Sequence, residues 1–391
     1  MLDTKFPPWP SFSDEEANKV RDVLLSNRVN YWTGTECREF EREFSEWSGI
    51  SHSVSLANGT VALDAALNAL DIGAGDEVIV TPRSFMASAS CVVTAGAVPV
   101  FVDVDRDSQN ITAKSILSGI SPRTKAIICV HLAGWPCEMD SIMALAREHG
   151  IAVIEDCAQA HGARYNSRCV GSIGDIGAWS FCQDKIMTTG GEGGMVTTGS
   201  RELWSRMWSY KDHGKSWDSV NARAHPPGFR WVHESFGCNG RMLEMQAAIG
   251  RLQLRALNGW IAARQEHAAR IWAAARTLRG LRAPEPPPHI EHAAYKCYVF
   301  VEPRELRTGW DRDRIMSEIN ARGVPCSSGS CSEIYLEKAF DGTGWRPAQR
   351  LPVAKELGET SLVFLVHPTL LPEHIARTCT ALTDVMTAAA R

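Results

Sequence analysis

Lys185 stands between an apolar, strand-like segment and a run of glycines, a placement that suits a reactive lysine. Ala178–Phe181 precedes it, and the glycine-rich Thr188–Gly194 follows it before the strand-like Met195–Thr198. A lysine amine condenses with an aldehyde cofactor to form an imine, and a desolvated amine is the better nucleophile. Glycines let the backbone approach a buried cofactor closely. Because most lysines are solvated surface charges, this one becomes a candidate only together with other residues.

Asp156 ends the apolar run Ile151–Ile154, directly after Glu155. Open α/β sheets hold their ligands at the carboxyl ends of their strands, so this carboxylate is well placed to reach a ligand. It can pair with a protonated pyridine nitrogen and keep the ring cationic, which lets a pyridoxal ring act as an electron sink. A helix cap or a surface ion pair explains an isolated aspartate equally well.

Asn58-Gly59-Thr60 leads into a segment whose apolar residues recur with helical spacing. These residues are Leu63, Ala66, Leu67 and Leu70. The free amides and the positive dipole end of a helix start bind anions, and the Thr60 hydroxyl adds a donor. The segment therefore predicts a phosphate site, although simple capping by Asn58 or Thr60 also explains it. A second polar turn, Phe236–Met242, precedes another helix, with Asn239 as a candidate cap.

Four short apolar segments rich in β-branched residues alternate with helix-like segments between residues 77 and 154. They are Glu77–Val80, Val98–Val102, Ala126–Val130 and Ile151–Ile154. Such alternation is typical of βαβ units and predicts a buried parallel sheet. Asp156 then lies at the carboxyl end of one of its strands.

Helices are expected at both ends of this region. One spans Asp14–Leu25, after a proline-rich extended arm at Phe6–Pro10. Another spans 242–257 and continues to about Leu278. Its first turns carry an apolar stripe that predicts core packing, formed by Met242, Met245, Ile249 and Leu252.

A change of structure is expected at the proline-rich Ala283–Pro288, which cannot be helical. Tyr298–Val301 and Ser361–Phe364 beyond it resemble strands of a smaller C-terminal α+β domain. We predict an N-terminal arm and first helix at residues 1–26, a large cofactor-binding domain at 27–255 and the small domain at 256–391.

The composition excludes several classes of partner. The 391 residues carry a net charge of −4, which gives no basic surface for nucleic acid or an anionic membrane. No apolar run reaches the length of a transmembrane helix, and no secretory signal is evident. Twelve scattered cysteines indicate reduced thiols in the cytoplasm, and Cys326 with Cys331 lacks the second pair that a zinc site needs, so no metal is expected.

The glycine clusters do not match a nucleotide site. Neither Gly171–Gly177 nor the cluster after Lys185 has the G-x-G-x-x-G pattern, and the P-loop pattern G-x-x-x-x-G-K-[ST] is absent. Hydride transfer and nucleotide hydrolysis therefore lose their main support.

The ordered motifs resemble those of the DegT/DnrJ/EryC1/StrS family of sugar aminotransferases. The resemblance runs from about residue 15 to the C-terminus and rests on Asn58–Thr60, Val130–Gly134, Glu155–Gly162, Ser180–Phe181 with Lys185, Gly191–Gly194, Asn239–Met242 and Val366–Leu370. It implies an α/β protein of fold-type I, with a mostly parallel seven-stranded sheet in the large domain. It also implies pyridoxal 5′-phosphate as cofactor, pyridoxamine 5′-phosphate as an intermediate, and a homodimer with shared active sites.

The family's residue roles carry over position by position. Lys185 matches the Schiff-base lysine and catalytic residue, Asp156 the partner of the pyridine nitrogen, and Gln159 a residue near the ring's 3′-hydroxyl or face. Gly59, Thr60 and Ser180 match the phosphate cradle. Asn239 matches an asparagine that reaches the phosphate of the neighbouring subunit, and Phe85 an aromatic residue stacked on the ring.

Two departures from the family pattern bear on the substrate. Gly240 stands where an aromatic residue is common, and Cys182-Gln183-Asp184 replaces the usual segment before the lysine. One branch of the family has histidine in place of the lysine and dehydrates its substrate, a chemistry that Lys185 argues against.

The resemblance implies ping-pong transfer of an amino group from glutamate or glutamine to a keto-sugar, expected to be nucleotide-linked. A keto-cyclitol of the scyllo-inosose type is the alternative substrate, and a non-catalytic regulatory protein that binds the cofactor is the alternative class. A nucleotide sugar would need basic groups for its diphosphate. The candidates in the loops at 212–233 and 326–338 and beside them are Lys211, Lys215, Arg223, Arg230 and Lys338.

Overall fold

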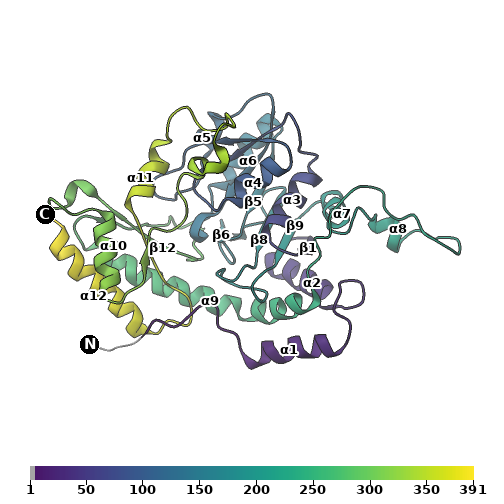
Figure 1. The fold of residues 1–391 in the computed structure, drawn as a ribbon, viewed down its shortest axis with the longest axis horizontal. Coiled ribbons are helices and arrows are strands. Elements are labelled where there is room, and N and C mark those ends of the chain that lie inside the picture. Colours follow the sequence, from purple (N-terminus) through teal and green to yellow (C-terminus); the bar gives the residue numbers. More distant parts are fainter. Residues whose placement is uncertain (1–4) are drawn as a thin grey trace.

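A seven-stranded sheet forms the centre of the molecule, in a computed structural model that describes residues 5–391 (Figure 1). Its strands, in spatial order, are β1 (His52–Leu56), β9 (Gly194–Thr198), β8 (Ile176–Ser180), β5 (Ala152–Asp156), β4 (Thr124–Val130), β2 (Glu77–Val80) and β3 (Val98–Phe101). All neighbours from β8 to β3 pair in parallel, whereas β9 runs antiparallel to both of its neighbours. The predicted parallel sheet and its four predicted strands are confirmed.

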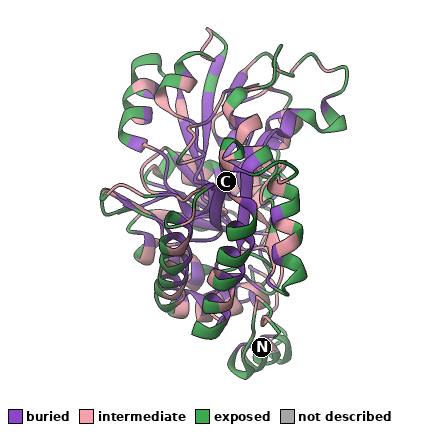
Figure 2. Cartoon of the chain, turned by 90° about the vertical axis from the view of Figure 1, so that its left-hand side faces the viewer, coloured by how far each residue is buried: buried purple, intermediate pink, exposed green. Residues whose placement is uncertain are grey.

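Helices flank this sheet and cover its apolar strands. They are α2 (Glu36–Ser48), α3 (Gly59–Ala69), α4 (Ala87–Thr94), α5 (Ala113–Leu117), α6 (Met139–His149), α7 (Arg201–Tyr210) and α9 (Glu244–Arg276). Of the two other helices before residue 276, α1 (Asp14–Leu25) packs against α9, and α8 (Trp217–Asn221) lies in the segment beyond α7. The strands are almost entirely buried, as Figure 2 shows by the purple colour along the centre. Parallel strands covered on both faces need such continuous apolar runs.

The long helix α9 confirms the predicted helix but corrects its predicted core face. Met242, just before it, is buried, whereas Met245, Ile249 and Leu252 are only half-buried. α9 packs against α1 and α2, and a Cβ added at Gly250 would lie 2.7 Å from the ring of Phe40. Close packing of this kind requires small residues, so the glycine face, not the stripe of large residues, meets α2.

A second sheet lies beyond the proline-rich segment. It contains β10 (Leu281–Arg282), β12 (Cys297–Val301), β14 (Ser361–Phe364) and β13 (Cys326–Ser327), paired antiparallel, and it is accompanied by α10 (Arg312–Ala321), α11 (Pro352–Thr360) and α12 (Pro372–Ala389). A small third sheet joins β11 (Ile290–Glu291), β6 (Arg164–Tyr165) and β7 (Arg168–Cys169). The boundary predicted after residue 255 falls inside α9, which contributes to both hydrophobic clusters.

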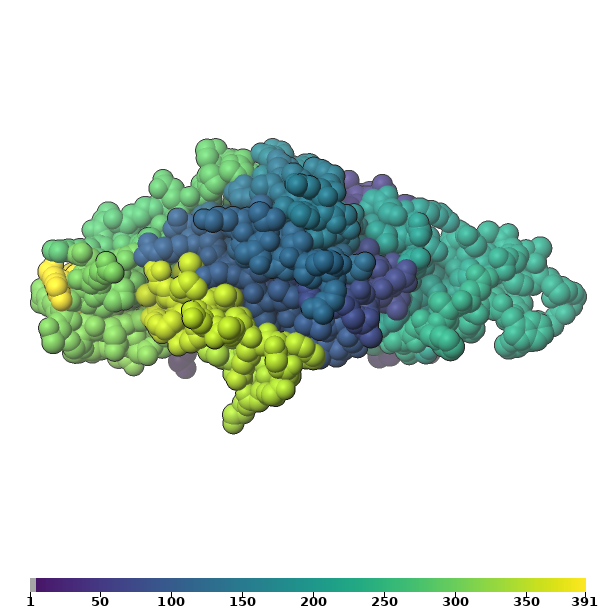
Figure 3. All heavy atoms as spheres, turned by 90° about the horizontal axis from the view of Figure 1, so that it is seen from above, coloured from purple at the N-terminus to yellow at the C-terminus, as the bar shows by residue number. Residues whose placement is uncertain are grey.

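The ends of the molecule carry two exposed features. Residues 5–12 form an extended arm without helix or strand, as predicted, before α1 begins after its Ser13 cap. The segment after α7, which includes α8, forms the teal end of the molecule in Figure 3. No helix within residues 5–391 is both long and apolar enough to cross a membrane.

Candidate active site

A cavity of about 780 Å³ opens where the strands of the large sheet end. Residues after β2, β5 and β8 line it together with the first turn of α3, so the carboxyl edge of the sheet forms its floor. Seven of the eight predicted site residues line it, namely Gly59, Thr60, Phe85, Asp156, Gln159, Ser180 and Lys185. Asn239, the eighth, is exposed and does not line this cavity.

Lys185 faces this cavity from the loop between β8 and β9. Its side chain is 13% exposed, and its Nζ lies 3.8 Å from Oδ1 of Asp184 and 5.1 Å from the ring centroid of Tyr295. Trp9 of the N-terminal arm donates a hydrogen bond from Nε1 to the Lys185 carbonyl, at 2.8 Å. The amine is therefore largely desolvated, and its backbone is held by a residue 176 positions away.

Asp184 and Tyr295 form a pair beside this lysine. The Tyr295 hydroxyl donates to Oδ2 of Asp184 at 2.5 Å. Burial would raise the pKa of the Asp184 carboxyl, but the charge of Lys185 and the hydrogen bond from Tyr295 lower it overall. Asp184 thus stays ionised and places a negative charge next to the reactive amine.

The first turn of α3 forms an anion cradle with Ser180. Asn58 caps the helix, because its Oδ1 accepts from the amide of Val61 at 3.0 Å. The amides of the first helical residues, Gly59 and Thr60, have no partner within the helix. A Cβ added at Gly59 would lie 2.6 Å from Cβ of Ser180, so only glycine lets the helix start approach β8 so closely. The same helix start therefore accommodates both the Asn58 cap and a phosphate site, because the cap leaves the amides of Gly59 and Thr60 free to bind an anion.

Asp156 lies at the floor of the cavity and is 5% exposed. Ser88 donates its hydroxyl to Oδ2 at 2.8 Å, and the amide of Ala158 donates to Oδ1 at 3.1 Å. These bonds fix the carboxylate without neutralising it, because neither donor carries a charge. The group can therefore serve a cationic ring nitrogen.

Gln159 and Phe85 occupy the remaining walls. Oε1 of Gln159 accepts from the amide of Ala133 at 2.9 Å, which fixes the side chain and leaves the Nε2 end as its donor. Phe85 is 70% exposed although it lines the cavity. An apolar ring so placed offers a flat face to a planar ligand. A buried carboxylate, a desolvated amine and an anion cradle around one cavity fit a planar aldehyde that carries a phosphate.

Comparison with known families identifies the chain. Residues 10–383 match the model of the DegT/DnrJ/EryC1/StrS aminotransferase family. The chain belongs to this family. It is also 38% identical to the UDP-N-acetyl-3-dehydro-alpha-D-glucosamine 3-aminotransferase of Acidithiobacillus ferrooxidans, over 93% of this chain and 94% of that protein.

Solved structures agree with this assignment. The aminotransferase from Psychrobacter cryohalolentis is 59% identical, with a TM-score of 0.96 over 98% of this chain and 99% of that one. S. venezuelae DesV, solved in complex with a ketimine intermediate, is 32% identical, with a TM-score of 0.84 over 95% and 94% of the two chains. The protein is an aminotransferase of fold-type I that uses pyridoxal 5′-phosphate.

Two expectations about the site of this aminotransferase are wrong. Asn239 does not cap α9, which begins at Glu244 with Leu243 as its N-cap; the Leu243 amide is instead bonded to Gln246. None of the five cations predicted to bind a diphosphate lines the cavity of its own chain, but only Lys211 is excluded as a ligand by its burial; the other four remain predictions. Lys211 is fully buried against the Tyr31 ring, and burial lowers its pKa to about 8, while Lys215 and Arg223 are paired with acidic neighbours.

Trp9 is a site residue that the sequence motifs did not reveal, because only the fold brings the arm to Lys185. Trp9→Phe keeps an aromatic ring against Trp260 but removes the hydrogen bond to the Lys185 carbonyl. Loss of one such bond, about 1 kcal/mol, is expected to lower kcat roughly fivefold at saturating cofactor. Trp260→Phe, which removes no hydrogen bond described for residues 5–391, is the matched control. Equal kcat values for the two variants would show that the bond does not position the lysine.

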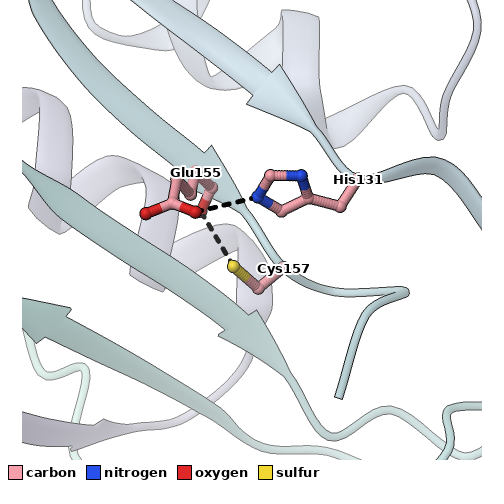
Figure 4. A group of neighbouring side chains, drawn as sticks. All are labelled: His131, Glu155 and Cys157. Carbon is pink, nitrogen blue, oxygen red and sulfur yellow. Dashed lines mark hydrogen bonds and ion pairs between the residues drawn. The ribbon is translucent and has the colours of Figure 1, made fainter. Parts of the chain in front are cut away.

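A buried network behind Asp156 joins His131, Glu155 and Cys157, which Figure 4 shows converging from neighbouring strands. Glu155 accepts from Nε2 of His131 at 2.9 Å and from the amides of Gly171, Ile173 and Gly174. Nδ1 of His131 accepts from the amide of Cys137, so Nε2 carries the proton. These bonds use both carboxylate oxygens and tie the segment after β7 to β5, which ends in Asp156.

Glu155→Gln is expected to lower the free energy of unfolding by about 3 kcal/mol, because it removes a buried charge from its donors. Burial raises the pKa of Glu155, but the bonds from His131, Gly174 and Gly171 outweigh burial and lower it. The stabilisation is thus present above the ordinary glutamate pKa and is lost as the pH falls through the lower, folded-state value. Unfolding curves between neutral and acidic pH measure it. Glu138→Gln, at an exposed pair with His289, is the control, and an equal loss there would contradict this role.

Proposed function

We propose that this aminotransferase transfers an amino group from glutamate or glutamine to a keto-sugar carried on a nucleotide. Lys185, Asp156 and the α3 cradle line one cavity, and this arrangement supports the transamination. The nucleotide-sugar substrate is supported by the relative that is named for a UDP-linked 3-keto sugar and covers almost the whole chain.

Lys185 is proposed to hold the cofactor through Nζ and, once released, to move the proton. When bound, pyridoxal 5′-phosphate supplies an aldehyde carbon that bonds to amines and a ring that accepts electrons. The freed Nζ would then act as a general base toward the α-carbon of the amino donor and, once protonated, as a general acid. Asp184 lies 3.8 Å from this amine and steadies it when it is protonated.

The other site residues are proposed to bind and orient. Gly59 and Thr60 offer backbone amides to the phosphate, and the Thr60 and Ser180 hydroxyls add donors. Asp156 keeps the ring nitrogen protonated, and Gln159 donates to the ring's hydroxyl. Phe85 covers the face of the ring and, by excluding water, strengthens these polar contacts.

Transfer of labelled nitrogen tests this function. The holoenzyme, supplied with α-¹⁵N-amino glutamate and α-¹⁵N-amino glutamine in separate assays, is expected to release a ¹⁵N-labelled amino sugar from a UDP-linked keto-sugar, detected by mass spectrometry. The same sugar without its nucleotide should react far more slowly. Amination of a keto-cyclitol, with no product from any nucleotide-linked keto-sugar, would contradict the proposal.

We infer that two copies of the chain share their active sites. The exposed position of Asn239 supports this, since it cannot serve the cavity of its own chain. Phe229, Trp231 and Phe236, in the segment between α8 and α9, are 73%, 81% and 98% exposed, which is typical of a surface that packs against another chain. A cytoplasmic location is supported by the twelve cysteines, all free thiols.

Mixing two inactive variants tests the shared site. Lys185→Ala and Asn239→Ala copies, unfolded and refolded together, should regain about a quarter of the original activity, because half of the dimers are mixed and each holds one intact site. Mixtures that stay inactive, or a monomer in light scattering, would contradict the shared site.

A further inference from the structure

Lys296 is the second cation of the cavity. Of the described residues that line it, only Lys185 and Lys296 carry a positive charge. Lys296 lies directly before β12 and is half-buried, with its Nζ donating to Oγ of Ser330 at 3.1 Å. None of the ion pairs described within residues 5–391 includes this amine, although its charge contributes to lowering the pKa of Asp184. A half-buried cation whose hydrogen bond goes to a neutral hydroxyl retains the capacity to bind an anion.

The amines of Lys296 and Lys185 both lie close to the ring of Tyr295. The amines of the two lysines lie 5.4 Å and 5.1 Å from the ring centroid of Tyr295. Both therefore lie within reach of a single small substrate. When the cofactor occupies Lys185, Lys296 is the side-chain cation that the described cavity offers to an acidic substrate.

The acidic residues around the cavity make such a cation necessary. Asp184, Glu192 and Glu337 line it, and they would repel an amino acid carboxylate or a diphosphate. Ser330 is itself fixed, because its amide donates to the hydroxyl of buried Tyr298 at 2.8 Å. The Lys296 amine is thus held by a rigid partner, which lowers the entropy lost when it binds a ligand.

We propose that Lys296 binds an anionic oxygen group of a substrate, either a carboxylate of the amino donor or the diphosphate of the nucleotide sugar. The identity of these substrates rests on the proposed function. The binding of an anion beside Lys185 does not, because it follows from the cavity alone.

Two unreactive probes show which substrate supplies the anionic group that Lys296 binds. Glutarate stands in for the carboxylates of the donor, and UDP stands in for the nucleotide diphosphate. Each is titrated calorimetrically into the holoenzyme at low ionic strength. Lys296→Gln is expected to weaken at least one probe about tenfold, as the loss of a charged hydrogen bond predicts, and the affected probe names the source. Lys296→Arg should stay within about threefold of the unaltered protein, because it keeps the charge.

Two further variants complete the test. Lys114→Gln removes an exposed lysine that does not line the cavity and should leave both affinities unchanged. Ser330→Ala should weaken the same probe as Lys296→Gln, by about threefold, and it covers the case in which Lys296→Gln fails to fold. Binding of neither probe by the unaltered protein, affinities unchanged in Lys296→Gln, or an equal effect of Lys114→Gln would overturn the proposal. Because neither probe reacts, these results are independent of whether a keto-sugar is aminated.

Discussion

Replacing Lys185 with alanine is expected to abolish the absorption band of the lysine-bound cofactor and to lower kcat at least about 10³-fold. The variant loses both the covalent attachment and the group that moves the proton, each of which is worth several kcal/mol. The cavity keeps Asp156 and the α3 cradle, so the cofactor should still bind non-covalently. Absorption spectra and single-turnover rates with the amino donor measure the two losses separately.

Lys185→Arg is the matched control for charge. It keeps a cation beside Asp184, yet a guanidinium neither forms the imine nor gives up a proton near neutral pH. Both variants should therefore lose the band and the turnover. A variant that kept the band together with full turnover would show that another amine carries the cofactor.

Asp156→Asn is expected to lower kcat about 10²- to 10³-fold while the cofactor remains attached. The amide keeps the shape of the carboxylate: its oxygen can still accept from the amide of Ala158, and its NH2 group can donate to the Ser88 hydroxyl, so the fold should be unaffected. It cannot keep the ring nitrogen cationic, and the ring is then a weaker electron sink. The half-reaction with the amino donor, followed by the absorption of the cofactor, isolates this step.

Ser88→Ala is the control for positioning at the same carboxylate. It removes one uncharged hydrogen bond but leaves the charge, so the expected loss is about tenfold or less. If Asp156→Asn lost no more than Ser88→Ala, the charge of Asp156 would have no part in the reaction.

The strands and the cofactor site could be predicted because their signals are local. Parallel strands that are buried on both faces are apolar along their length. The strand at 152–156 could therefore be predicted from its apolar run, together with the position of the carboxylates at its end. The start of α3 could also be predicted from a local signal, because a capping asparagine and a glycine come before apolar residues with helical spacing. Seven residues of the cavity follow from such segments together with the family resemblance.

The rest of the site depends on contacts between distant segments. Trp9 reaches Lys185 from the other end of the chain, and Tyr295 reaches Asp184 from beyond the proline-rich segment. No periodicity or spacing reports such contacts. The prediction for Lys211 is wrong because a sequence does not show in which direction a charged side chain points: Lys211 points into the protein, whereas Lys296 faces the cavity.

The central claim is that Lys185 carries the cofactor, and reduction of the holoenzyme tests it most directly. Borohydride converts the lysine–cofactor bond into a stable amine, and peptide mass spectrometry then locates the added mass. The structure predicts one modified residue, Lys185, in the peptide that follows β8. Label on Lys296, on Lys211 or on no lysine would contradict the assignment.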